Sequence, residues 1–331
     1  MKERVKLSGD PAYTYAVGRV RARERRLLTT RALTEAAEAK GFEAALEALR
    51  EGGYEKTAPS AAGVEELIAR QSVELDRFLS ESAPDEKLVA HLRLEADYAN
   101  LKAALVGRLG GKRPSFTEGW SLPADRLASL AEGGEPDGLP EPFGALAREL
   151  LEEWDKNADP FLLQQDVDRA LFTRLGESAR ELKLPFLAAY QRLEIDLVNL
   201  VALARCLAAP EPGELAPAAF IPGGGLDVAR LEGFARAGDR AGAAAYVGRT
   251  PYADFVPAVE AATETLGDLT AREAAKKLDF LRQARHAPFG PEPVIAYYLA
   301  KKNEFRLVRF VLTCKLAGVP PETITARLWG A

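Results

Sequence analysis

The chain has few of the side chains that bind metals or act as nucleophiles. Its 331 residues include only two cysteines, two histidines and one methionine. Zinc sites and Ser-His-Asp or Cys-His centres need several such side chains close together. We therefore expect no catalytic residue, no metal ligand and no cofactor. Cys206 and Cys314 cannot form a disulfide framework, and their apolar helical surroundings predict small buried side chains.

Long apolar runs and nucleotide-binding loops are missing too. No segment approaches the roughly 18 apolar residues that suggest a membrane span. Residues 1–10 read MKERVKLSGD and lack the apolar stretch of a signal peptide. The string nearest to a P-loop, residues 107–113, has the first glycine misplaced and Arg113 where Ser or Thr is required. We expect a cytoplasmic protein with no transmembrane segment of its own.

Charge is unevenly distributed along the chain. The net charge is −5, which argues against a general nucleic-acid-binding protein. Residues 1–31, however, contain nine Lys or Arg and three Asp or Glu, a net charge of +6. On a helix, this segment would present two rows of arginines, and it is either a solvated basic face or a docking face for an acidic partner or anionic headgroups. The rows are Arg19, Arg23 and Arg26, and Arg21 and Arg25.

The periodicity of apolar residues is helical along most of the chain. Leu94, Tyr98, Leu101 and Leu105, for example, recur at steps of three and four. Alternating runs rich in Val, Ile and Thr are absent, so the predicted fold class is all-α. Helix-stopping clusters of Gly and Pro occur at 110–114, 210–213 and 318–321.

One short sequence word occurs twice and then a third time in altered form. It reads LEADYANL at 94–101, LEIDLVNL at 193–200 and KNEFRLV at 302–308. This recurrence indicates that one helical unit has been used three times. A period near 100 residues is too long for a solenoid repeat and predicts tandem domains. We place them at 1–114, 115–217 and 218–331.

The polar positions of this word are candidate functional residues. A carboxylate and an amide three residues apart share one face of a helix, beside the apolar stripe. The acidic groups could together line one site, or each could anchor the structure of its own domain. We favour structural anchors, because tandem copies usually separate equivalent groups. The anchors are Asp97, Asn100, Asp196, Asn199 and Glu304.

Both ends of the chain resemble a known family. Residues 13–24, YTYAVGRVRARE, look like the opening of the C subunit of the archaeal and bacterial V-type (A-type) ATP synthases, the counterpart of the d subunit in the eukaryotic vacuolar proton pump. The stretches PFG at 288–290 and PVIAYYLAK at 293–301 are similar to the closing part. The family usually has Glu at 302 and Asn-Leu at 307–308, where this chain has Lys and Leu-Val. That departure weakens a specific role for the third anchor.

The resemblance implies three similar helical domains arranged with pseudo-threefold symmetry as a funnel. It also implies a non-catalytic adaptor in the central stalk of a rotary ATPase, one copy per complex, between the rotor shaft (the D and F subunits) and the proteolipid ring. No nucleic acid is implied as a partner. The candidate partner contacts are Arg19, Arg21, Arg23, Arg25 and Arg26. The alternative is an unrelated helical scaffold built from a triplicated module.

Overall fold

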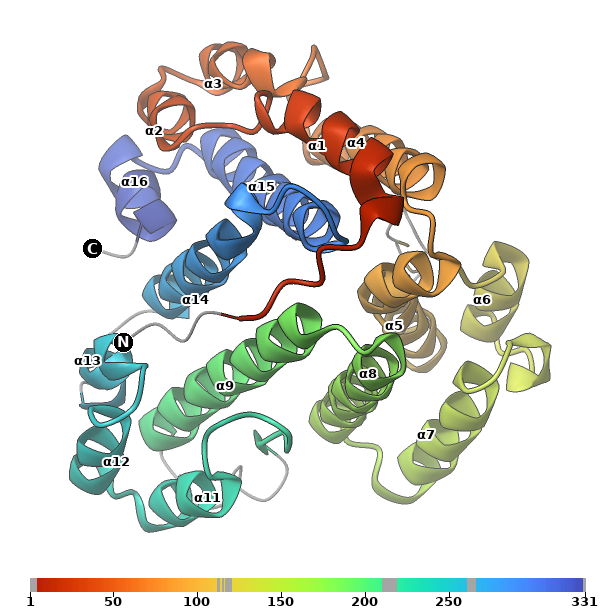
Figure 1. The fold of residues 1–331 in the computed structure, drawn as a ribbon. Helices are drawn as coiled ribbons and strands as arrows, with labels where there is room; N and C mark the ends of the chain where they lie inside the picture. The colour runs from red at the N-terminus through yellow and green to blue at the C-terminus, as the bar shows by residue number, and fades with distance from the viewer. Residues whose placement is uncertain are drawn as a thin grey trace. The chain divides into compact units, whose positions relative to one another are not determined.

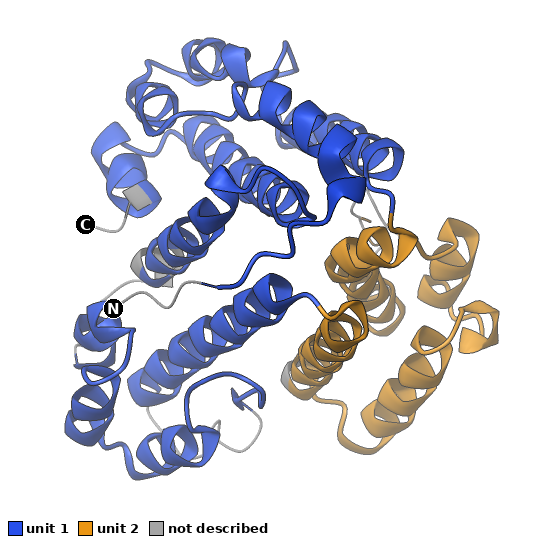
Figure 2. Cartoon of the chain, viewed as in Figure 1, with its two compact units in different colours: residues 1–84, 184–331 blue, residues 85–183 orange. Residues whose placement is uncertain are grey.

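Helices joined by loops make up the protein. The computed structural model describes residues 5–111, 114, 116, 121–209, 219–260 and 266–329, and these ranges contain no β-strand (Figure 1). The all-α prediction is confirmed. Contacts between residues divide the chain into two compact units: residues 1–84 with 184–331, and residues 85–183 (Figure 2).

The unit of residues 85–183 has its own hydrophobic core. The leucine stripe of its first long helix packs against the next helix and against the last one. Leu101, Leu105, Leu127 and Leu130 are completely buried, and each buried leucine contributes about 1.5–3 kcal/mol to folding. The elements are α5 (Glu86–Gly110), α6 (Ala124–Ala131), η3 (Pro136–Gly138), α7 (Phe143–Asn157) and α8 (Pro160–Leu182).

Within the larger unit, the helices after residue 184 form a second set around a long helix, α9 (Pro185–Ala208). This helix packs against four of those that follow it. Leu200, Leu231, Val247 and Phe255 lie completely buried in their shared core. The other elements of the set are α11 (Val228–Ala237), α12 (Arg240–Val247), η4 (Ala253–Phe255), α13 (Val256–Glu260) and α14 (Leu266–Leu281).

The rest of the larger unit joins the two ends of the chain. The long helix α15 (Glu292–Leu316), near the C-terminus, packs against α1, α2, α3 and α4 from the N-terminal region. The backbone N–H of Ser8 also donates to Glu292 at the start of α15, at 2.6 Å. The remaining elements are η1 (Pro11–Tyr13), α1 (Thr14–Glu24), α2 (Thr30–Glu38), α3 (Phe42–Ala48), η2 (Arg50–Gly52), α4 (Ala61–Ser82), η5 (Arg282–His286) and α16 (Pro321–Trp329).

Side-chain caps determine where several of these helices begin. The Thr29 hydroxyl accepts a hydrogen bond from Ala32 N at 3.1 Å at the start of α2. Asp227 accepts one from Arg230 N at 3.3 Å at the start of α11. Such a cap contributes about 1 kcal/mol and satisfies a backbone donor that the helix itself leaves free. The starting points of α2 and α11 therefore follow from local sequence.

The three helices that carry the repeated word each belong to a set of packed helices. The chain continues from α5 and from α9 through shorter helices to another long helix, α8 and α14 respectively, whereas α15 packs against α2, α3 and the long α4 from the other end of the chain. The boundaries predicted at 114 and 217 separate α5 and α9 from their own short helices. The division into three similar domains stays a prediction. If the domains follow these sets of helices, their boundaries differ from those predicted at 114 and 217.

Candidate functional site: buried carboxylates and the arginines of α1

Glu304, on α15, holds the loop between α1 and α2. Its carboxylate is buried and accepts hydrogen bonds from Leu28 N at 2.7 Å and from the Tyr54 hydroxyl at 2.8 Å. Lys301, one helical turn earlier, donates to the same carboxylate at 2.5 Å and to Gly52 O at 3.2 Å. A buried charge is stable only when it is paired and hydrogen-bonded, and here both charges are.

Asp196, on α9, binds the loop before α11 in the same way. It accepts hydrogen bonds from Gly225 N at 2.8 Å, Leu226 N at 2.9 Å and the Tyr252 hydroxyl at 2.7 Å. The carboxylate comes so close to the loop that a Cβ on Gly224 would overlap with its Oδ1 atom. A side chain at position 224 would therefore push the Asp196 carboxylate away from its donors.

Asp97, on α5, is the equivalent group in the smaller unit. It accepts hydrogen bonds from Ser121 N at 2.6 Å and Leu122 N at 3.1 Å. Burial raises the pKa of the Asp97 carboxyl above its ordinary value, and the bonds from Ser121 and Leu122 act in the opposite direction. Asp97 thus belongs to the same structural class as Asp196 and Glu304.

The three carboxylates make one recurring contact. Each accepts the backbone N–H of a leucine two residues before a helix: Leu28 before α2, Leu122 before α6 and Leu226 before α11. The carboxylates bind three different loops. Each also places a negative charge near the start of a helix, where the helix dipole favours it. Each carboxylate thus joins a loop to a long helix, and the anchoring role of the three stays a prediction.

Sequence reasoning missed the tyrosines that complete two of these anchors. Tyr54 and Tyr252 donate to Glu304 and Asp196, and each lies 26 residues after the anchored leucine. This equal spacing is the feature of the sequence that could have identified both tyrosines. In the smaller unit the corresponding position is Arg148, which pairs with Asp137 at 2.6 Å instead.

The amide positions of the word differ between the copies. Asn199 is completely buried, and its side chain exchanges two hydrogen bonds of 2.8 Å with the backbone of Ile221. Asn100 is also buried, at 1% exposure. In the third copy Leu307 takes this position and is buried as an apolar side chain. Glu304 alone therefore remains as a polar anchor there.

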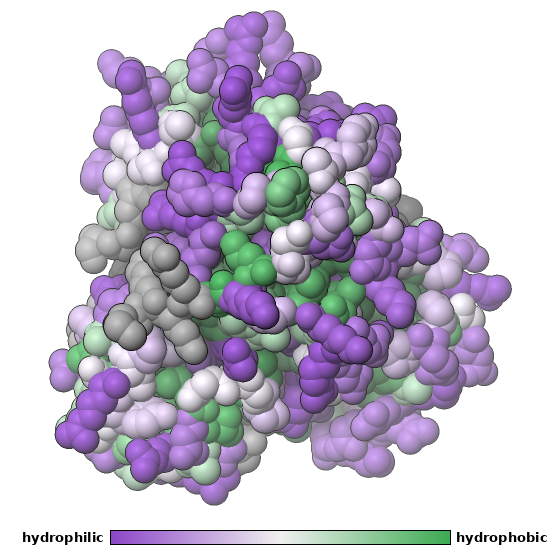
Figure 3. Space-filling view, viewed as in Figure 1, coloured by the Kyte–Doolittle hydropathy of each residue, from purple (hydrophilic) through white to green (hydrophobic). Residues whose placement is uncertain are grey.

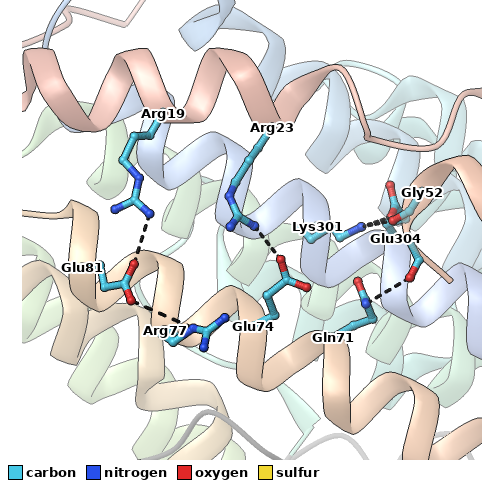
Figure 4. A network of polar contacts seen from close by, with 10 residues as sticks. Arg19, Arg23, Gly52, Gln71, Glu74, Arg77, Glu81, Lys301 and Glu304 are labelled. Carbon is cyan, nitrogen blue, oxygen red and sulfur yellow. Dashed lines mark hydrogen bonds and ion pairs between the residues drawn. The ribbon is translucent and has the colours of Figure 1, made fainter. Parts of the chain in front are cut away.

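The first row of arginines on α1 faces α4. Arg19 pairs with Glu81 at 3.1 Å, and Arg23 pairs with Glu74 at 3.0 Å (Figure 4). Both guanidinium groups also lie over the ring of Phe78, at 5.1 and 4.4 Å from its centre. Cation–π contacts of this kind contribute about 0.5–1 kcal/mol at exposed sites. Arg19 and Arg23 therefore fasten α1 to α4.

The second row begins with another internal contact. Arg21 binds both carboxylate oxygens of Glu24, at 2.8 and 2.7 Å, and donates to Ala287 O at 2.9 Å. Arg25 and Arg26, at the end of α1, are exposed and form no ion pair with any residue that the structure describes. Of the five arginines predicted to contact a partner, Arg25 and Arg26 are therefore the two whose guanidinium groups are not paired with a described acidic side chain.

The described ranges contain no group of His, Cys, Asp and Glu side chains that could hold a metal ion. None of their helices is both long and apolar enough to cross a membrane. Cys206 and Cys314 are both buried, as predicted. Hydrophilic side chains cover most of the face shown in Figure 3.

The chain belongs to the ATP synthase (C/AC39) subunit family, whose pattern matches residues 16–327. Its class is therefore that of the A/V-type ATP synthase subunits. It is similar to a protein of Thermococcus kodakarensis (strain ATCC BAA-918 / JCM 12380 / KOD1) that is named as the C subunit of the A-type ATP synthase. The two are 24% identical over 336 residues, which cover 94% of this chain and 89% of the relative. The predicted resemblance is confirmed.

Proposed function

We propose that this chain is the central-stalk adaptor of a rotary A/V-type ATPase. In this role it links the rotor shaft, made of the D and F subunits, to the membrane proteolipid ring. It works as a single non-catalytic copy, at the cytoplasmic side of the membrane. The observation that carries the proposal is the family match over residues 16–327. That match also removes the alternative of an unrelated helical scaffold.

The buried hydrogen bonds within the chain support the proposal in physical terms. An adaptor that transmits torque must not change shape when its two partners twist it. Buried, hydrogen-bonded polar groups have one preferred geometry and resist sliding better than apolar contacts do. Asp97, Asp196 and Glu304 each fasten a loop and a helix start to a long helix through such groups.

A bridging assay tests the proposal. The purified shaft, made of the D and F subunits, is immobilised, and the detergent-solubilised proteolipid ring is passed over it with and without this chain. We expect the ring to be retained only when the chain is present, and less ring to be retained as salt rises, because exposed ion pairs are screened. Binding of the chain to neither partner, or to one alone, would overturn the adaptor role.

A second measurement addresses the non-catalytic part of the proposal. The isolated chain is incubated with ATP and Mg²⁺, and released phosphate is followed. The expected rate equals that of the buffer. Hydrolysis that co-purifies with the chain and persists through two independent chromatographic steps would contradict the proposal.

A further inference from the structure

A groove in the larger unit lies beside the second row of arginines on α1. It encloses about 520 Å³ and is bordered by α1, α2, α14, η5 and α15. Its floor is apolar and comes mainly from α14 and α15, through residues that include Leu278, Leu281, Ala296, Ala300 and Leu307. We call it the arginine groove, after the four arginines that line it: Arg21, Arg25, Arg282 and Arg285.

The arginines border the groove from two chain segments. Arg21 and Arg25 come from the α1 segment, whereas Arg282 and Arg285 come from η5. Arg25 and Arg285 are exposed and have no ion pair within the described part of the chain. Arg282 contacts Asp279 only at 3.9 Å. Positive charge on this groove is therefore available to a partner.

The carboxylates of the groove are already occupied. Glu24 is bound by both of its oxygens to Arg21. Glu304 is held by Lys301, Tyr54 and Leu28. Neither can neutralise Arg25 or Arg285 without giving up these bonds. The groove therefore combines an apolar floor with two exposed arginines, Arg25 and Arg285, that have no ion pair among the described residues.

We propose that the arginine groove receives one amphipathic helix of the rotor shaft, with acidic residues beside its apolar stripe. Apolar side chains at positions i, i+3 or i+4, and i+7 of such a helix would cover the floor. Its carboxylates would reach Arg25 and Arg285, whose guanidinium groups bind carboxylates through two hydrogen bonds. This inference rests on the proposed adaptor function and specifies where and how the shaft is held.

Charge reversal with a matched control tests the inference. The double variant R25E/R285E reverses the rim, while R205E/R249E makes the same change in net charge with exposed arginines outside the groove. Binding to the purified shaft of D and F subunits is measured at low and high salt. At low salt we expect R25E/R285E to lose roughly tenfold or more in affinity. The control should lose about threefold at most, through weaker long-range attraction.

A third variant tests the floor without changing charge. Ala300→Phe places a ring in the groove and should weaken shaft binding at both salt concentrations. All variants are first compared with the wild-type chain by thermal melting. Vesicles containing anionic phosphatidylglycerol are tested in parallel, because an acidic headgroup would also suit the arginines.

The outcomes separate the two proposals. A wild-type chain that does not bind the shaft overturns the adaptor function and this inference with it. A wild-type chain that binds, with R25E/R285E and Ala300→Phe binding equally well, overturns only the inference. Loss of vesicle binding in R25E/R285E with shaft binding intact also overturns it, because the groove would then be a lipid site.

Discussion

Asp196 and Glu304 each accept hydrogen bonds from a leucine N–H and from a tyrosine hydroxyl inside the same larger unit. These donors replace the hydrogen bonds that water would otherwise make to the buried carboxylate. The desolvation cost is offset only while all the donors remain. Removing a single donor should therefore have a measurable effect.

Tyr252→Phe tests this at one atom. The substitution keeps the buried ring and removes the hydroxyl that donates to Asp196 at 2.7 Å. We expect the free energy of unfolding to fall by about 1–3 kcal/mol, because the carboxylate loses a buried donor. Tyr15→Phe is the control, since Tyr15 is 67% exposed. Equal stability of the two variants in urea titrations would contradict the anchoring role of Tyr252.

His91, on α5, makes stability depend on pH. Burial lowers its pKa to about 4, with Glu95 opposing the shift and Arg174 reinforcing it. Its Nδ1 atom is buried without a hydrogen-bond partner in the described structure. The imidazole is thus neutral in the folded protein, whereas the unfolded chain binds a proton below a pKa of about 6.5. Stability from this group is complete above pH 6.5 and is lost as the pH falls towards 4.

The expected loss is about 3 kcal/mol over that interval, at about 1.4 kcal/mol for each pH unit. Unfolding free energies of the wild-type chain and of His91→Leu are compared at several pH values from 7 to 4. The variant lacks the titrating group, so the wild type should lose stability relative to it as the pH falls. A difference that does not change with pH would show that folding leaves the pKa of His91 at its ordinary value.

At the scale of single elements, α1 is fastened to α4 by mixed contacts. In the Arg23–Glu74 ion pair, the Glu74 side chain is 43% exposed to solvent. Ion pairs with such exposure contribute only about 0–1 kcal/mol. The contact of Arg23 with the Phe78 ring is less sensitive to the loss of Glu74. The packing and cation–π contact of Arg23 with Phe78 should therefore contribute more to stability than the Arg23–Glu74 ion pair does.

A double-mutant cycle measures this balance. We expect Arg23→Ala to destabilise the protein more than Glu74→Ala, with a coupling energy between the two residues below about 1 kcal/mol. Salt should reduce the coupling energy but leave most of the Arg23→Ala effect. A coupling energy above about 2 kcal/mol would mean that the ion pair dominates.

The long helices could be predicted from the sequence, but the partners of their polar side chains could not. Periodicity predicted α5, α9 and α15, because apolar stripes and Gly or Pro stops are local signals. The partners of Asp97, Asp196 and Glu304 were not predictable in the same way. Apart from Lys301, which lies three residues before Glu304, their donors lie 24 to 276 residues away, and two of them are tyrosines outside the repeated word. Likewise, the rows of arginines were visible, but Glu74 and Glu81 on α4 were not identified as their partners.

At the scale of the whole molecule, the helix sets predict which fragments fold alone. Residues 85–183 keep α5 together with α6, α7 and α8, and they form one compact unit. Residues 115–217, the middle domain predicted from the spacing of the repeated word, lack α5. They include α9 without the helices that cover it. A fragment with its own core can fold alone, whereas one that exposes a long apolar face cannot.

We therefore expect fragment 85–183 to unfold cooperatively on heating and fragment 115–217 to lack a cooperative transition. Both are purified under the same conditions and followed by near-ultraviolet circular dichroism, which reports fixed aromatic packing. If fragment 115–217 unfolded cooperatively and fragment 85–183 were disordered, the result would support the domain boundaries at 114 and 217.

The packing of α15 against α2, α3 and α4 has a consequence for synthesis on the ribosome. Those three helices are translated first, but α15 begins only at residue 292. At about 5–20 residues per second, more than 200 intervening residues take roughly 10–40 s to translate. During that delay residues 85–183 can complete their own core, while the apolar faces of α2–α4 still lack their partner. The nascent chain therefore has a period in which its earliest segment depends on chaperones, and slower translation would lengthen that period.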